Sequence, residues 1–113
     1  MSKLLVKKTP VLTAQPSARI FPIGGGACYV DEKDAFWLSH FRWRLYHGKY
    51  KKYAYRRFTI DGKTHTIKMH RELMNCPKDM ETHHKDLNGL NNCKDNLVNL
   101  TPIDHRLAHG KSR

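Results

Sequence analysis

The spacing of apolar residues along the chain predicts short strands alternating with short helices. An apolar run at 27–30 predicts a strand, and apolar residues at helical spacing predict a helix over 32–41 with Asp31 as its N-cap. Aromatic and β-branched residues on both sides of His47-Gly48 favour two strands between 42 and 60.

Turn residues connect these strands to a third. Asp61-Gly62 is the strongest hairpin signal in the chain, and it predicts a tight turn before a strand over 63–69. A helical turn or two follows over 71–74 and is stopped by Pro77.

The last third of the chain predicts a strand, a loop, a second strand and a helix. The strands are expected over 80–85 and 97–100, and the loop between them, 86–96, is rich in Asn and Gly. Thr101 is a good N-cap for the final helix, and Gly110 ends it.

Together the elements predict an α+β protein made of three segments. Residues 1–18 contain lysines and prolines but no acid, which indicates a basic N-terminal arm. Residues 19–75 predict a small antiparallel sheet with a short helix, and residues 76–113 predict the strand-loop-strand-helix unit.

Charge narrows the choice of partner. The chain has 113 residues, with 21 Lys and Arg against 10 Asp and Glu, for a formal net charge of +11. Such a charge repels itself unless a polyanion is bound, so nucleic acid is the first partner to consider. No apolar run is long enough for a transmembrane helix, and no long basic amphipathic helix is visible. The N-terminus, MSKLLVKKTPVL, has only two or three apolar residues in a row between lysines, so it lacks the h-region of a signal peptide. We therefore expect a cytoplasmic protein without a membrane partner.

The cysteines predict no site of their own. Cys28, Cys76 and Cys93 are odd in number, widely spaced and without a CxxC pair. This pattern argues against a disulfide framework and against a zinc ribbon, and it fits free thiols in a reducing compartment.

The segment 42–60 combines positive charge with aromatic residues and contains no acid. Cations on a strand can neutralise phosphates, and tyrosines offer hydroxyl donors and planar surfaces. The candidates for DNA contact are Arg42, Arg44, Lys51, Lys52, Tyr53, Tyr55, Arg56 and Arg57. Most of the larger apolar residues nearby are expected in the core: Trp37, Trp43, Leu45, Phe58 and Ile60.

Histidines concentrate near the C-terminus. His83 and His84 are adjacent on a predicted strand, so their side chains point to opposite faces and can serve different roles. His105 and His109 are four residues apart on the predicted helix, so they share one face and could bind one transition metal. The isolated His70 is expected to be buried against the sheet rather than catalytic.

The stretch THHKDLNGLNNCKDNLVNLTPIDHRLAHG resembles the His-Asn-His (HNH) nuclease motif. The resemblance implies a ββα-metal fold and a metal-dependent DNA endonuclease. It assigns metal binding to His83 and His105, general-base catalysis to His84 and a loop-holding role to Asn96. It leaves His109 as a third metal ligand or a phosphate contact.

The residues before this motif carry a second resemblance. The strings YVDEKDAFWLSHFRWRLYHGKYKKYAYRR and GKTHTIKMHREL are similar to the segment that precedes the motif in phage homing-type endonucleases. That segment is similar to the APETALA-type plant DNA-binding domain, a three-stranded sheet packed on a helix. The resemblance implies that 19–75 binds double-stranded DNA, and that the compartment would be the host-cell cytoplasm for a phage-encoded protein.

The sequence is compatible with more than one metal, more than one oligomeric state and two functions. Many relatives have Asp where this chain has His83, and an imidazole at that position favours Zn²⁺, Ni²⁺ or Mn²⁺ over Mg²⁺. A monomer would nick one DNA strand, whereas a homodimer could cut both. The alternative is a non-catalytic DNA-binding module with a structural His-rich metal site, which would have no need of His84.

Overall fold

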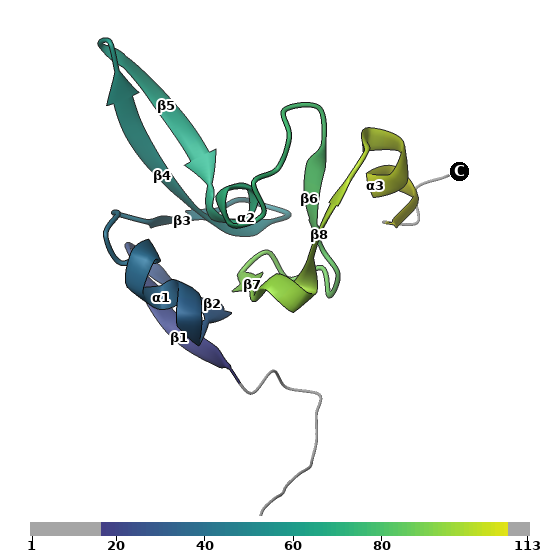
Figure 1. The fold of residues 1–113 in the computed structure, drawn as a ribbon, viewed down its shortest axis with the longest axis horizontal. Coiled ribbons are helices and arrows are strands. Elements are labelled where there is room, and N and C mark those ends of the chain that lie inside the picture. Colours follow the sequence, from purple (N-terminus) through teal and green to yellow (C-terminus); the bar gives the residue numbers. More distant parts are fainter. Residues whose placement is uncertain (1–16, 109–113) are drawn as a thin grey trace, which may run out of the picture.

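Figure 1 shows the fold as a computed structural model, which describes residues 17–108. Most of the predicted N-terminal arm lies outside the described residues, as do His109 and Gly110. The elements of the described part are, in chain order, β1 (Ala18–Ile23), β2 (Gly26–Asp31), α1 (Glu32–Leu38), β3 (Arg44–His47), β4 (Lys52–Ile60), β5 (Lys63–Lys68), α2 (Met69–Leu73), β6 (Glu81–His84), β7 (Asn91–Asn92), the 3-10 turn η2 (Lys94–Asn96), β8 (Leu97–Leu100) and α3 (Pro102–Ala108). This mixture of strands and short helices confirms the predicted α+β class.

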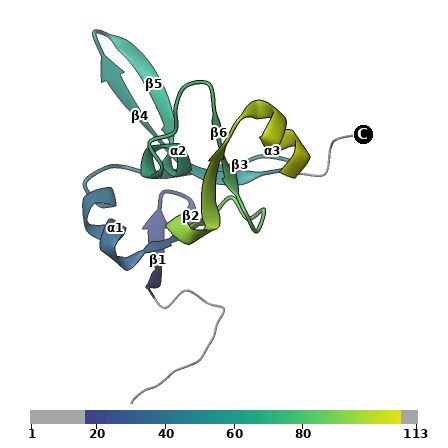
Figure 2. The same ribbon diagram turned by 45° about the vertical axis from the view of Figure 1, so that its right-hand side comes forward.

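The strands of the described part form three small sheets. β1 and β2 are antiparallel, and β7 adds to β2 in parallel. β3, β4 and β5 form an antiparallel meander, and β6 pairs antiparallel with β8. Figures 1 and 2 show α3 beside the β6-β8 pair and the β4-β5 hairpin extending away from the rest of the fold.

The predicted hairpin turn is present between β4 and β5. Asp61 and Gly62 have φ angles of 50° and 77°, the positive values that a two-residue turn of type I′ requires. Asp and Gly tolerate this left-handed backbone better than other residues do. The turn therefore sets the register of the β4-β5 hairpin.

Two strands were not predicted from the pattern. β1 contains Pro22 and buries only Phe21, so it lacks a clear apolar alternation; as an edge strand it tolerates the proline. β7 has two residues and lies inside the loop expected over 86–96. Only its long-range pairing with Tyr29 and Val30 of β2 identifies it as a strand.

Helix α1 ends three residues earlier than expected. The Ser39 hydroxyl donates to the Phe36 carbonyl at 2.6 Å, and a ring nitrogen of His40 lies 2.9 Å from the same oxygen. These contacts satisfy the Phe36 carbonyl oxygen, which lies in the last turn of the helix, and the helix ends at Leu38. At the other end Asp31 is the N-cap residue, but its carboxylate accepts a hydrogen bond from the Lys94 backbone instead of capping the helix.

One hydrophobic core connects the sheets with helices α1 and α2. Trp43 is buried as predicted, and the core includes Phe21, Val30, Leu38, Ala54, Met69, Leu73 and Leu97. Trp37 is partly buried against this core, Leu45 and Phe58 are half-buried outside it, and Ile60 is 54% exposed, so the expectation that most of these residues are core is wrong. Ile60 lies at the tip of the β4-β5 hairpin, beyond the reach of the helices.

The predicted segments 19–75 and 76–113 share a sheet and the core, because β7 pairs with β2 and Leu97 lies in the common cluster. They also meet at Gly89, where a Cβ atom would overlap the Lys52 carbonyl oxygen. A residue without a side chain is therefore required for this close approach.

The sequence predicts free cysteines and no transmembrane helix. Cys28, Cys76 and Cys93 are all free, and the first and last of them are buried. Within residues 17–108, no helix has the length and apolar character needed to cross a bilayer.

Candidate functional site

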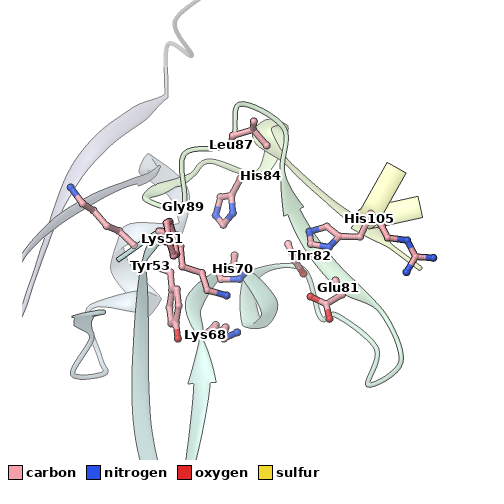
Figure 3. A pocket seen from close by; sticks show the side chains of 13 residues that line it. Lys51, Tyr53, Lys68, His70, Glu81, Thr82, His84, Leu87, Gly89 and His105 are labelled. Atoms are coloured by element: carbon pink, nitrogen blue, oxygen red, sulfur yellow. The ribbon is translucent and has the colours of Figure 1, made fainter. Parts of the chain in front are cut away.

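The two adjacent histidines of β6 have different neighbours, as alternation along a strand predicts. The ring of His83 packs against the ring of His105 on α3, with centroids 5.4 Å apart and planes at 76°. His84 contacts His70 of α2 instead, with centroids 4.6 Å apart. Figure 3 shows His84 and His105 on either side of β6.

His84 is half-buried and has a polar partner. Its Nε2 lies 2.8 Å from the Oδ1 of Asn92, which is fully buried on β7. Burial lowers the pKa of His84, although the hydrogen bond to Asn92 and the charge of Asp86 act in the opposite direction. The imidazole is therefore neutral at neutral pH, the form that can accept a proton.

His70 is buried, as expected from the sequence, but it lies within the site. Burial lowers its pKa to about 3, and the neighbouring His84 and Lys68 add to the shift. Its ring packs between Tyr53 on β4 and His84 on β6, with centroid distances of 6.1 Å and 4.6 Å. His70 thus connects the β3-β4-β5 sheet to the histidines of β6.

Asn96 holds the loop that follows His84. Its Oδ1 accepts from the backbone N–H of Asp86 at 3.0 Å, and its Nδ2 donates to the Asp86 carboxylate and the Asn91 carbonyl, both at 2.9 Å. The Asn96 carbonyl also accepts from the Lys85 backbone N–H at 2.7 Å. These contacts match the loop-holding geometry expected of Asn96, and they place the loop on the same side of β6 as His84.

An open cleft of about 490 Å³ lies beside these histidines. Figure 3 shows Lys51, Tyr53, Lys68 and His70 gathered near His84. The cleft wall has four cationic residues and one carboxylate. The cations are Lys51, Lys52, Lys68 and Arg106, and the carboxylate belongs to Glu81. The cleft therefore favours an anion.

Lys68 shows how crowded these cations are. Its pKa is lowered mainly by burial and next by the charge of Lys51, and Glu81 compensates only in part. Its ammonium lies 4.9 Å from the ring centroid of Tyr53. A bound phosphate would relieve the repulsion between Lys51 and Lys68.

One face of the β3-β4-β5 sheet leads into this cleft. Strand register places Arg44 opposite Tyr55, Tyr46 opposite Tyr53, and Tyr55 opposite Lys68, all on one face. We call this the basic-aromatic face; its members are Arg44, Tyr46, Tyr53, Tyr55, Arg57 and Lys68. Tyr46 stacks on Tyr53 at 4.7 Å, and Arg57 lies over Tyr55. The face carries no acid, since threonines are its other residues on β4 and β5.

The predicted DNA contacts do not all lie together. Arg44, Tyr53, Tyr55 and Arg57 belong to the basic-aromatic face, and Lys51 and Lys52 line the cleft. Arg42 is exposed in the segment between α1 and β3.

Arg56 points to the opposite face of the sheet. It makes a bidentate ion pair with Glu72 at 2.9 and 3.0 Å, and its guanidinium lies 4.0 Å from the ring centroid of Phe41. Its contacts are therefore internal and stabilise the fold.

The metal candidates are gathered only in part. His83 and His105 face each other, whereas His109 lies outside the described residues. Between residues 17 and 108, no three His, Cys, Asp or Glu side chains are grouped closely enough to hold an ion.

Sequence reasoning missed three members of the site. Asn92 and Lys68 were not singled out, and His70 was expected to be buried but not to contact His84. The only signal for Asn92 was the Asn-rich loop, which does not distinguish it from its neighbours. These roles depend on contacts between residues far apart in the chain.

The chain was compared with known protein families, with curated proteins and with solved structures, and none of the three comparisons finds a match.

The depressed pKa of His70 predicts acid sensitivity of the fold. Unfolded His70 takes up a proton below pH 6.5, whereas the folded protein resists this until about pH 3, so stability is lost as the pH falls below 6.5. At pH 5 the cost is about 2 kcal/mol relative to pH 7.5. In His70→Phe, urea unfolding at the two pH values should show a correspondingly smaller loss. An unchanged loss would mean that His70 is protonated in the folded state.

Proposed function

We propose that this protein is a metal-dependent endonuclease that hydrolyses a phosphodiester bond of double-stranded DNA. His84 acts as general base, and His83 with His105 holds a divalent ion. The observation that carries the proposal is the division of the β6 histidines between two environments. His83 faces a second imidazole on α3, and His84 lies in the cationic cleft with a polar partner on its ring.

The order of the C-terminal elements supports the proposal. β6 and β8 pair antiparallel and α3 follows directly, which is the order of a ββα-metal unit. The Thr101 hydroxyl accepts from the Asp104 backbone N–H at 3.2 Å, so the predicted cap starts the helix that carries His105. The resemblance to His-Asn-His nucleases assigns roles to these same residues.

His83 and His105 fit a divalent ion as two of its ligands. Imidazole nitrogens suit Zn²⁺, Ni²⁺ and Mn²⁺ better than Mg²⁺, although all four remain candidates. His109, water or the DNA phosphate would supply its other ligands. A bound ion would act as a Lewis acid on the scissile phosphate and on the leaving 3′ oxygen.

The protein's own residues supply the rest of the chemistry. Neutral His84 takes a proton from water while the water oxygen attacks phosphorus, and the bond to the 3′ oxygen breaks. Asn96 keeps the loop after His84 in place. Lys51 and Lys68 attract the phosphate into the cleft.

The basic-aromatic face extends the binding surface beyond the cleft. Arg44 and Arg57 lie on it, and Tyr53 and Lys68 belong to both the face and the cleft. DNA lying along this face would bring a phosphate to His84. Arg56 takes no part, because its guanidinium is paired with Glu72 on the other face.

Cleavage is tested with supercoiled plasmid. The full chain should produce open circles with Mg²⁺, Mn²⁺, Zn²⁺ or Ni²⁺, and excess EDTA should stop the reaction. His84→Ala should lower kcat by roughly 10²–10⁴-fold, because a general base contributes about that much. A homodimer would also yield linear plasmid, whereas a monomer would yield circles alone.

The matched control for this assay is His65→Ala, which removes an exposed histidine of β5 outside the cleft wall. It should nick at the wild-type rate. Equal nicking with EDTA would remove the metal mechanism. Equal nicking by His84→Ala would indicate a contaminating nuclease and leave the non-catalytic DNA-binding module as the better description.

DNA binding is tested through its salt dependence. Arg44→Ala combined with Arg57→Ala should weaken binding and reduce the slope of log K against log[salt] by about 2, since each phosphate contact contributes about 0.9. Fluorescence anisotropy with a labelled duplex measures both quantities. The control, Lys33→Ala with Lys63→Ala, removes the same charge from exposed sites on α1 and on the opposite face of the sheet. If the two double variants have equal slopes of log K against log[salt], the DNA does not bind along the basic-aromatic face.

A further inference from the structure

We infer that Asn92 and His70 are positioning residues that hold the His84 ring from two sides, with its proton on Nε2 and with Nδ1 as the nitrogen available to the substrate. The use of Nδ1 in catalysis rests on the function proposed above. The orientation and the tautomer of the ring do not, and they can be measured without any cleavage.

Asn92 is a rigid partner for His84. It is fully buried, and its backbone position is set by pairing with Val30 of β2. Its Oδ1 lies 2.8 Å from Nε2 of His84, a normal hydrogen-bond distance. Among the described residues no hydrogen bond engages the other ring nitrogen of His84.

The surroundings of Asn92 determine which way its amide points. Its Nδ2 lies 3.2 Å from the Sδ of Met69, a sulfur that can only accept. Cys28 also donates toward this sulfur at 3.8 Å, and burial raises its pKa to about 12, so it remains a thiol. The amino group of Asn92 therefore faces the sulfur, and its oxygen faces His84.

An amide oxygen accepts but does not donate, so the contact with Asn92 requires a hydrogen on Nε2 of His84. A neutral imidazole carries only one such hydrogen. Nδ1 consequently keeps its lone pair and is the nitrogen able to accept a proton. Asn92 thus selects the tautomer, much as partners of metal-bound or catalytic histidines do elsewhere.

His70 closes the second side of the ring. It packs against His84 at 4.6 Å with planes at 62°, and Tyr53 backs it at 6.1 Å. The backbone of His70 belongs to α2, a different element from the β7 strand that carries Asn92. Contacts from two separate elements restrict both the tilt of the ring and its rotation, which catalysis requires to be small.

The test is the tautomer of His84, read from ¹H–¹⁵N correlation spectra of the ¹⁵N-labelled full chain at neutral pH. Signals of His84 are identified by their loss in His84→Ala. We expect hydrogen on Nε2 in the wild type, retention of that state in Asn92→Asp, and a mixture of tautomers in Asn92→Leu, which has no acceptor. Hydrogen on Nδ1 in the wild type overturns the inference, as does an unchanged tautomer in a folded Asn92→Leu.

Cleavage kinetics give a second readout. Asn92→Leu and His70→Ala should lower kcat by roughly 10–100-fold with KM nearly unchanged, and His70→Phe should restore most of the rate by restoring a ring. Equal rates for His70→Ala and wild type would remove His70 from the inference. If the wild type does not cleave DNA, the proposed function fails, and the spectra still decide the tautomer. If Asn92→Leu does not fold, the spectra of the wild type and of Asn92→Asp decide the tautomer of His84.

Discussion

Two residues of β7 pair with β2, and the candidate site depends on this short parallel ladder. The ladder buries Asn92 below His84 and anchors the loop that Asn96 holds from the other side. It is reinforced by the Tyr29 backbone N–H, which donates to the Leu90 carbonyl at 2.7 Å. Without this pairing, β6 would still pair with β8, but the His84 ring would lack Asn92 as its hydrogen-bond partner.

The same pairing joins the histidines to the cationic surface. Because β7 belongs to the sheet of β1 and β2, the loop before it is drawn against β4, where Gly89 meets the Lys52 carbonyl. His70 then reaches His84 from α2, directly after Lys68 at the end of β5. The basic-aromatic face and His84 are thus connected through neighbouring elements, an arrangement that suits the proposed chemistry, which needs a phosphate held at a defined place.

Local features of the fold were predictable from the sequence, and long-range ones were not. Asp61-Gly62 determines its own turn, Thr101 caps its own helix, and the adjacent His83 and His84 must point to opposite faces of a strand. Asn92 is indistinguishable from its neighbours until β7 pairs with a strand 62 positions earlier. Arg56 fits a DNA-binding pattern equally well, yet strand register turns it toward Glu72.

The most direct test of the account is calorimetric titration of Zn²⁺ or Mn²⁺ into the wild type, His83→Ala and His84→Ala. We propose that metal binding belongs to the face of β6 that meets His105, and proton transfer to the face that meets Asn92. His83→Ala should therefore bind the ion roughly tenfold or more weakly, while His84→Ala binds as the wild type does. The opposite pattern, with metal lost in His84→Ala and kept in His83→Ala, would contradict the account by exchanging the roles of the two faces.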